Sequence, residues 1–414
     1  MTGPSQPPSA TLPHPEEEAW PPELRLLLGP DGAGLLSAVA DIAGGTLVSW
    51  RPRQVSHQPG RSTIVQYRAG MRWENGETTS SETFVAATGD RIPQQDAAIF
   101  DDGSTRVAVW RWPQDPFLPG LSDALDSRKV GLLLDELGID GGIVRLRTRA
   151  YRPGRRAVVE ATGRRGRLFL KVVRPERVEA LHERHRSLAH VLPVPKSLGW
   201  SSGGVLVLTG LPGETLRAAL RSSRHPAPAP EAIVGLLDRL PAELAEKPPR
   251  RDLFSSVQQH AETIAATVPS AAGRLGAVID ALATGNDDDP GPVTAAHGDL
   301  YEAQLLVDRG RITGLLDIDT AGPGLRVDDL ANFCAHLSVL AQTSDRPRQI
   351  RRFGAALLAH AEAHHPRAVL RRRIAAAVVS LATGPFRVME AGWPTNTARR
   401  LDLAAEWLGG VERG

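Results

Sequence analysis

The sequence contains little cysteine and almost no net charge. Cys334 is the only cysteine among 414 residues, so an internal disulfide is excluded and a reducing compartment is favoured. It lies in the apolar segment LANFCAHLSVL, which favours a small buried side chain over a nucleophile. The 49 Lys and Arg residues are nearly balanced by 47 Asp and Glu, leaving a net charge of +2. This balance gives no electrostatic case for binding nucleic acid or an anionic membrane.

Long apolar runs are also missing. The longest strongly apolar run, IAAAVVSLA at 374–382, is far too short to span a bilayer. The first 22 residues contain seven prolines and no Lys or Arg. They lack the basic and apolar regions of a signal peptide. We therefore expect a soluble, cytoplasmic protein with a disordered tail over residues 1–22.

The chain is rich in β-strand patterns up to about residue 210 and in helical patterns beyond it. Within the first part, HQPGRSTIVQYRAG at 57–70 resembles YRPGRRAVVEATG at 151–163. Each segment places Pro-Gly-Arg before a β-branched strand. Two interpretations are open: two unrelated hairpins with the same turn chemistry, or a degenerate duplicate of one small β-sheet unit.

The segment HGDLYEAQLLV at 297–307 contains the most informative motif. Gln304 follows Asp299 by five residues and precedes an apolar, strand-like run. Phosphoryl transfer from ATP needs a cation on the phosphates, a carboxylate near the attacking hydroxyl, metal ligands and a loop over the triphosphate. Asp299 is the candidate carboxylate, which would accept or steer the proton of a substrate hydroxyl.

Gln304 and Asp317 are candidate ligands for magnesium, a hard ion that amide and carboxylate oxygens satisfy. The sequence LLVDRGRITGLLDID that follows Gln304 predicts a β-hairpin turning at Asp308-Arg309-Gly310. A hairpin brings its two ends together, so Gln304 and Asp317 could meet at one ion.

Lys171, in the strand-like LFLKVV, is the candidate phosphate-binding cation. Strand interiors seldom contain lysine unless it faces solvent or a site, and an exposed lysine is the alternative interpretation. The next predicted helix offers Glu179 and Glu183 as ion-pair partners that would orient Lys171. We favour Glu183, because two turns into the helix its side chain can face the sheet.

The segments HGDLYEAQLLV and GLLDIDTAGPGLRVDDLANF closely resemble the aminoglycoside phosphotransferase superfamily, which includes choline and sugar kinases. Usable motifs extend over residues 143–340. The resemblance implies an α+β fold of the two-lobed protein-kinase type, with a β-rich N-lobe and an α-rich C-lobe. It also implies that ATP and Mg²⁺ are the cofactors.

The resemblance assigns roles to several residues. Asp299 matches the catalytic aspartate and Asp317 the magnesium-binding aspartate. Asp329 matches an aspartate that braces the catalytic loop, and within this motif His297 is expected to orient the loop. In LVLTGLPGETL, the backbone from Leu208 to Gly210 would bind adenine. The segment YRPGRRAVV occupies the place of the phosphate-covering turn without being a glycine-rich loop.

Gln304 departs from the superfamily pattern, because most members have Asn at this place. Glutamine adds one methylene and extends the amide by about 1.5 Å. Bacterial maltokinases and a related glucosamine kinase resemble the chain in having Gln here and an additional N-terminal cap. The domains implied are a cap over residues 23–130, an N-lobe over 131–212 and a C-lobe over 213–414.

The expected acceptor is a small hydroxylated molecule: a sugar, an amino sugar or an aminoglycoside. Tyr301 and Glu302 in the catalytic loop are candidate acceptor contacts, and so is Trp393. If the strand continues, Asp319 would share a strand face with Asp317 and could touch the acceptor or a second metal; a solvated carboxylate is the alternative interpretation. Aminoglycosides are polycations, yet the C-terminal helices contain no clear acidic cluster. The alternative function is a nucleotide-binding pseudoenzyme or regulator whose cap blocks the cleft.

Overall fold

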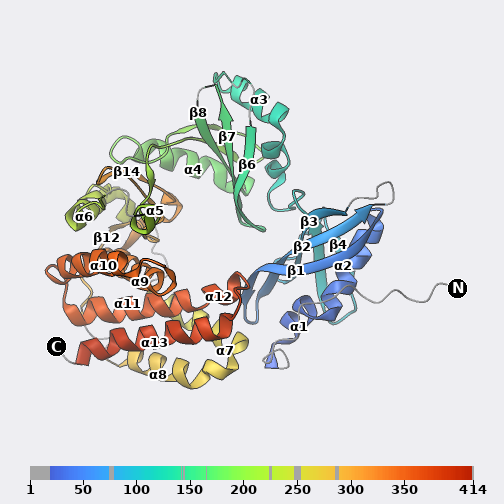
Figure 1. Ribbon diagram of the computed structural model, residues 1–414. Helices are drawn as coiled ribbons and strands as arrows, with labels where there is room; N and C mark the ends of the chain where they lie inside the picture. Colours follow the sequence, from blue (N-terminus) through green and yellow to red (C-terminus); the bar gives the residue numbers. More distant parts are fainter. Residues whose placement is uncertain are drawn as a thin grey trace.

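The computed structural model describes residues 19–73, 79–140, 142, 145–164, 166–222, 226–246, 253–284 and 289–412. These residues form two separate five-stranded antiparallel sheets followed by a largely helical region (Figure 1). The predicted α+β class is confirmed. The two lobes of a kinase-like fold are present, together with an additional N-terminal cap. Within the described part of the chain, no helix has the length and hydropathy needed to cross a bilayer.

The cap consists of two helices packed on the first sheet. Its elements are α1 (Pro22–Leu28), α2 (Pro30–Ile42), β1 (Gly45–Gln58), β2 (Ser62–Trp73), β3 (Thr79–Gly89), β4 (Ala98–Asp101) and β5 (Arg106–Arg111). The strand order is β1-β2-β3-β5-β4. Tyr67 on β2 is fully buried under the helices, and its hydroxyl donates to the carbonyl of Leu27 at 2.7 Å.

The N-lobe contains the second sheet and one long helix. Its elements are η2 (Pro119–Leu121), η3 (Asp123–Leu125), α3 (Ser127–Glu136), β6 (Arg145–Arg152), β7 (Arg156–Gly163), β8 (Gly166–Val173), α4 (Pro175–Leu188), β9 (Ser197–Trp200) and β10 (Val205–Thr209). The strand order is β6-β7-β8-β10-β9. Leu118 and Leu121 pack in the core of this sheet, so the cap ends before residue 118 and not at the predicted residue 130.

The two sheets share one topology. In each, the first three strands are neighbours in chain order and the last two are exchanged. Both first hairpins turn through Pro-Gly-Arg, and the turn glycines Gly60 and Gly154 have φ of 66° and 63°. The register pairs Gln58 with Ser62 in the cap and Arg152 with Arg156 in the N-lobe. Shared strand order favours a duplicated unit over two unrelated hairpins.

The C-lobe holds the remaining short strands and most of the helices. Its strands are β11 (Glu214–Thr215), β12 (Val293–Ala296), β13 (Leu305–Asp308), β14 (Arg311–Leu315) and β15 (Gly322–Leu325). Its helices are α5 (Leu216–Ser222), α6 (Pro230–Asp238), η4 (Ala242–Glu246), α7 (Leu253–Thr267), η5 (Pro269–Ala271), α8 (Ala272–Ala283), η6 (Ile318–Thr320), α9 (Arg326–Thr343), α10 (Pro347–Glu362), α11 (Arg367–Ala382), α12 (Gly384–Arg387) and α13 (Trp393–Glu412). Helix α11, buried on most sides, is the centre of the helical core.

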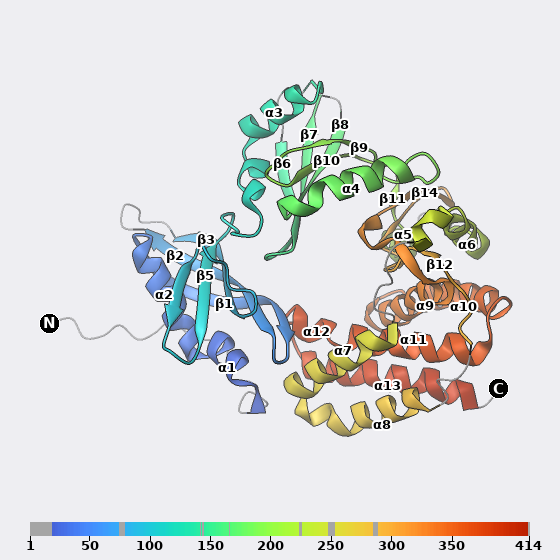
Figure 2. The same ribbon diagram turned by 180° about the vertical axis from the view of Figure 1, so that it is seen from behind.

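The cap contacts the C-lobe as well as the N-lobe, and the ribbon views show it beside both (Figures 1 and 2). Trp20 is buried between Phe386 and Trp393, with ring centroids at 6.1 and 6.2 Å. Its indole N–H donates to the carbonyl of Thr267 at 3.2 Å. Of the tail predicted over residues 1–22, residues 1–18 lie outside the described residues. Trp20 is buried, so the predicted boundary at residue 22 is too far along the chain. The acceptor role suggested for Trp393 is also wrong, because this side chain is used in packing.

Candidate active site

Helix α9 forms hydrogen bonds to the loop that carries the candidate catalytic residue Asp299. Asp329, in the first turn of α9, is buried and accepts from the backbone N–H groups of His297 at 2.7 Å and Gly298 at 2.8 Å. Asn332, one turn later, donates to the carbonyl of Leu300 at 3.0 Å. The sequence VDDLANF therefore places two loop-binding side chains on one helix face, because residues three apart are neighbours on a helix.

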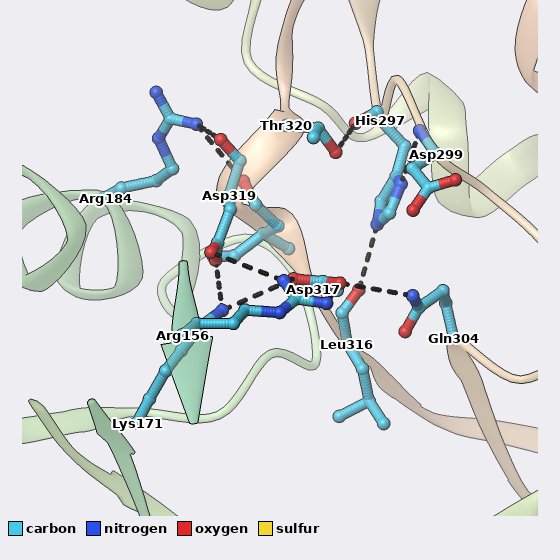
Figure 3. Close-up of polar contacts among 11 residues, drawn as sticks. Arg156, Lys171, Arg184, His297, Asp299, Gln304, Leu316, Asp317, Asp319 and Thr320 are labelled. Carbon is cyan, nitrogen blue, oxygen red and sulfur yellow. Dashed lines mark hydrogen bonds and ion pairs between the residues drawn. The ribbon is translucent and has the colours of Figure 1, made fainter. Parts of the chain in front are cut away.

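His297 is fully buried and links the loop to the segment after β14. Its Nε2 lies 2.9 Å from the carbonyl of Leu316, and its Nδ1 lies 3.3 Å from the backbone N–H of Asp299. The carbonyl can only accept, so Nε2 carries the proton and Nδ1 accepts from Asp299. Thr320 also donates to the carbonyl of His297 at 2.9 Å. These contacts fit the loop-orienting role predicted for His297 (Figure 3).

The predicted hairpin forms and turns where expected. Strands β13 and β14 pair from Leu305 with Leu315 to Asp308 with Arg311, and Arg309 and Gly310 have positive φ in the turn. The amide nitrogen of Gln304 lies 3.4 Å from a carboxylate oxygen of Asp317. The structure therefore brings the two predicted metal ligands together. Asp317 itself is left-handed, with φ 55° and ψ 46°, which turns the chain out of β14.

The donor atoms around Asp317 suit a magnesium ion. No group of three His, Cys, Asp or Glu side chains in the described ranges converges into a protein-only metal site. Magnesium, however, is usually held by one or two carboxylates together with substrate phosphates and waters. The Asp317 carboxylate and the Gln304 amide match that smaller set, since an amide flip would turn the Gln304 oxygen toward the ion. The residues present therefore fit the metal that the fold implies.

Lys171 lies on β8 and faces the carboxylates of the loop after β14. Its Nζ is 2.5 Å from Asp319 and 3.3 Å from Asp317. The predicted pairing with α4 is wrong: Glu183 is 62% exposed and contacts Arg186 and His182, and Glu179 is exposed as well. Both glutamates face solvent, because the buried face of the helix consists of Val178, Leu181, His185 and Leu188.

Helix α4 contributes two other residues to the site, which the sequence reasoning missed. Arg184 donates to the backbone carbonyls of Ile318 and Asp319 and ties the loop after β14 to the N-lobe. His185 lines the cavity beneath Lys171 and its Nδ1 lies 2.7 Å from the carbonyl of Pro195. Burial lowers the pKa of His185 to about 4. The side chain is therefore neutral at physiological pH.

Arg156, at the start of β7, is a third site residue that the sequence reasoning missed. Its guanidinium binds both carboxylate oxygens of Asp317, at 2.8 and 2.9 Å, in a bidentate pair. It follows the Pro-Gly-Arg turn that stands where the phosphate-covering loop is expected. The run of arginines in YRPGRR was the available signal. A turn that covers phosphates needs either glycines, which let its backbone approach the phosphates closely, or cationic side chains, which neutralise the phosphate charge.

Two carboxylates of the site titrate very differently. Burial opposes ionisation of Asp317, but Lys171 and Arg156 outweigh it and hold its pKa well below the usual range. Burial and the negative charge of Asp317 raise the pKa of Asp299 to about 6. His297, Arg152 and Arg156 lower this pKa, but their effect is smaller. Paired carboxylates with separated pKa values are typical of acid–base sites.

A cavity of about 360 Å³ opens beside these residues, between the two lobes. Its apolar walls come from both lobes and include Val158, Phe169, Leu208, Leu306 and Leu316. Apolar side chains suit a nucleobase, and Lys171 and Arg156, which also line the cavity, suit phosphates. Leu208, at the start of the segment whose backbone was predicted to bind adenine, lines the cavity. The N–H of Gly210 donates to Arg167 at 3.1 Å and that of Thr209 to Lys196 at 2.9 Å, so neither amide is free for adenine.

The candidate acceptor residues Tyr301, Glu302 and Asp319 lie in different environments. Tyr301 is partly exposed, and its ring stacks on that of His336 with the centroids 4.2 Å apart. Burial and then the negative charge of Asp299 raise the pKa of Tyr301. Glu302 is fully buried and binds Arg217 of α5 at 2.7 Å, so it anchors the loop and cannot contact an acceptor. Asp319 belongs to the turn η6, not to a strand, yet its carboxylate still reaches Lys171.

The sequence profile described as the Phosphotransferase enzyme family matches residues 149–370, which is more than half of the chain. The match begins in the N-lobe and includes the His-Gly-Asp loop, Asp317 and Asp329. The chain belongs to this phosphotransferase family. No curated protein sequence matches it, and the maltokinase-like subfamily has no support from these comparisons.

Several solved structures are similar to this family member. An aminoglycoside phosphotransferase, APH(4)-Ia, is 17% identical, covers 68% of this chain and 98% of its own, and has a TM-score of 0.47. The macrolide 2'-phosphotransferase MphH from Brachybacterium faecium is 23% identical, with coverage of 66% and 98% and a TM-score of 0.42. Choline kinase from Cryptosporidium parvum is 11% identical, with coverage of 65% and 90% and a TM-score of 0.43.

Proposed function

We propose that this phosphotransferase transfers the γ-phosphate of ATP, with Mg²⁺, to a hydroxyl group of a small molecule, and that the acceptor is a sugar. One observation carries the proposal. Asp317 and Lys171 line a mostly apolar cavity of about 360 Å³. His297 connects the backbone of Asp299 to Leu316, the residue before Asp317. All the charged groups that phosphoryl transfer needs are present, so nothing in this site favours the pseudoenzyme alternative.

The reaction needs a base at the acceptor hydroxyl. The acceptor oxygen attacks the γ-phosphorus, its proton moves to the carboxylate of Asp299, and the bond from the γ-phosphorus to the β,γ-bridging oxygen breaks to release ADP. A carboxylate with a pKa of about 6 is ionised at neutral pH and still close enough in basicity to take a proton. The fixed loop around His297 positions this carboxylate at little entropic cost.

The phosphates would be held by the cations that now contact Asp317. Lys171 and the guanidinium of Arg156 both reach the place where the triphosphate must lie, at the end of the cavity. Asp317 and Gln304 would hold Mg²⁺, which neutralises charge on the β- and γ-phosphate oxygens when bound. Asp319 then remains the carboxylate that orients Lys171. In the nucleotide complex Arg156 would then pair with phosphate, Asp317 with Mg²⁺, and Lys171 with both phosphate and Asp319.

The test is ATP turnover with a panel of neutral sugars, amino sugars, anionic sugars and aminoglycosides, with and without Mg²⁺. We expect ADP formation that requires both metal and acceptor, and phosphorylated product by mass spectrometry. The Asp299→Asn protein is the matched control, because it retains the shape of the site and loses the base. Acceptor-stimulated turnover that persists without a metal, or that is equal in the variant, would contradict the proposal.

A further inference from the structure

A second, smaller pocket lies where the cap, the N-lobe and the C-lobe meet. Its cavity volume is about 40 Å³, room for a group of a few heavy atoms such as a carboxylate or phosphate. The polar side chains around it are Gln54, Ser56 and Gln66 of the cap, Arg152 and Arg155 of the β6–β7 turn, and Arg387 at the end of α12. The pocket is thus built from three regions that are far apart in the sequence.

The cap supplies its part through strand register. Gln54 and Ser56 are two residues apart on β1, so they share one face of the sheet. Gln66 pairs directly with Gln54 across β1 and β2 and lies on the same face. The opposite face carries Val55 and Tyr67, which are buried under the cap helices. Neutral hydrogen-bonding side chains therefore line the cap side of the pocket.

The turn that carries Arg152 and Arg155 is held rigidly. Asp115, in the link between cap and N-lobe, is buried and accepts from the N–H of Gly154 at 2.8 Å. Arg174 donates to the carbonyl of Gly154 at 3.0 Å. Both backbone groups of the turn glycine, its N–H and its C=O, are therefore hydrogen-bonded. These bonds fix the backbone from which both arginines extend, so less backbone freedom is lost when an anion binds.

The arginines of this pocket have no acidic counterpart of their own. Among the described residues, none of Arg152, Arg155 and Arg387 forms an ion pair with a carboxylate. Arg152, Arg155 and Arg387 are solvent-exposed at the rim of the pocket. Partial desolvation, followed by neighbouring arginines, lowers the pKa of Arg155, and partial desolvation with Arg152 lowers the pKa of Arg387. Like charges gathered in a concave site repel one another, and they focus a positive potential toward an incoming anion.

The pocket adjoins the catalytic carboxylate. Arg152 pairs with Arg156 across the β6–β7 hairpin, and Arg156 binds the carboxylate of Asp317 at 2.8 Å. The positive charge of Arg152 opposes the rise in the pKa of Asp299, and the negative charge of Asp299 opposes the fall in the pKa of Arg387. An acceptor whose hydroxyl lies at Asp299 would therefore extend toward these arginines. A cationic acceptor would meet three positive charges there, which disfavours an aminoglycoside or amino sugar.

The geometry points to an anionic acceptor: the pocket of Arg152, Arg155 and Arg387 binds a carboxylate or phosphate group of the sugar whose hydroxyl receives the γ-phosphate at Asp299. This inference rests on the proposed function and narrows its acceptor class. It also gives the cap a role, because Gln54 lines the side of the pocket that faces the arginines and completes the site around the anion. Carboxylate and phosphate both match the planar, multi-donor guanidinium.

The test is calorimetric binding to the full-length protein saturated with Mg²⁺ and a non-hydrolysable ATP analogue, so that the nucleotide site is filled. The probes are glucuronate, glucose 6-phosphate and glucosamine, which separate carboxylate, phosphate and cation on one sugar frame. We expect at least one of the two anions to bind and glucosamine not to bind. Arg387→Gln and Arg152→Gln should weaken that binding roughly 10- to 100-fold, the range for a hydrogen bond between charged groups. Arg399→Gln, an exposed arginine on α13 outside the pocket, is the matched control and should change nothing.

The outcomes separate this inference from the proposed function. Absence of binding by both anions, preferred binding of glucosamine, or anion binding unchanged in Arg387→Gln and Arg152→Gln would overturn the anionic-acceptor inference. Phosphorylation of a neutral or cationic sugar at a higher kcat/KM than its anionic counterpart would overturn it as well, while the proposed function would stand. Failure of the nucleotide analogue to bind would overturn the proposed function itself.

Discussion

The ammonium group of Lys171 lies 2.5 Å from the carboxylate of Asp319, on the loop that also carries Asp317. Both side chains are buried, with 8% and 12% exposure. The partner of the β8 lysine is therefore supplied by the C-lobe and not by helix α4. Because the pair spans the two lobes, it also couples the position of the N-lobe sheet to the loop that carries Asp317.

Asp319→Asn should raise the KM for ATP roughly tenfold or more, because Lys171 loses the charge that orients it and a buried charged hydrogen bond is removed. Glu183→Gln is the matched control, since this exposed glutamate contacts only Arg186 and His182. Steady-state kinetics over a range of ATP concentrations measure the difference. Equal KM values for the two variants would rule out the orienting role of Asp319.

Asp299→Asn should lower turnover by roughly two to four orders of magnitude, the range for loss of a general base. The same change should raise the melting temperature at pH near 8. The pKa of Asp299 is about 6 in the folded protein, above the usual aspartate value, so the folded state is penalised once the group ionises. The stability gain should disappear at about pH 4, where the carboxyl is protonated in the folded protein. Unchanged turnover, or a lower melting temperature at pH 8, would contradict this account.

The acidic limb of the pH profile should report Asp299. With a pKa of about 6, its carboxylate protonates as pH falls below that value, and kcat/KM should fall with it. Asp317 remains ionised throughout, because Lys171 and Arg156 hold its pKa far lower. Arg152→Gln should move the midpoint upward, since Arg152 favours the ionised form of Asp299. A wild-type profile that is flat down to about pH 5 would exclude Asp299 as the titrating base.

Gln304→Asn tests whether the site is built for the longer amide. The Gln304 side chain lies 3.4 Å from Asp317, and shortening it withdraws the amide by about 1.5 Å. We expect the magnesium concentration for half-maximal turnover to rise in the order wild type, Asn variant, Gln304→Ala. Magnesium titrations of the three proteins give the answer. An Asn variant that needs less magnesium than wild type would show that Gln304 is not adapted to the site.

Arg156→Gln tests the cation that the sequence did not single out. If Arg156 moves from Asp317 to the triphosphate when nucleotide binds, its loss should raise the KM for ATP roughly tenfold or more. Turnover at saturating ATP should change much less. Arg167→Gln is a useful comparison, because Arg167 lines the same cavity but, unlike Arg156, has no described ion pair with Asp317. A lower KM for ATP in Arg156→Gln would mean that Arg156 does not bind the triphosphate and only competes with the metal for Asp317.

Local spacing in the sequence was sufficient for the catalytic segment. The hairpin between Gln304 and Asp317 depends only on a two-residue turn and paired apolar strands, so its ends had to meet. Asp329 and His297 were assigned by resemblance and are indeed in contact, at 2.7 Å. These are short-range features or motifs that carry their own geometry, and for that reason they could be read before any tertiary structure was known.

The partner of Lys171 could not be derived in the same way. Helical periodicity gives the faces of α4, but only packing decided that Val178 and Leu181 face inward and Glu183 faces solvent. Trp393 likewise was placed near the acceptor on composition, whereas Trp20, far away in the sequence, buries it in the cap interface. Contacts between distant segments depend on how whole elements dock, and a spacing rule contains no such information.

By itself the sequence determined the chemistry of the loop, the hairpin and the α+β class, because strand and helix periods and turn residues act locally. The tertiary structure alone decided which charges meet. It paired Lys171 with Asp319 and Arg156 with Asp317, and it gathered Arg152 and Arg387 from two lobes beside the cap. Electrostatic interactions act through space and fall with distance, so they follow the docking of lobes and not the order of residues along the chain.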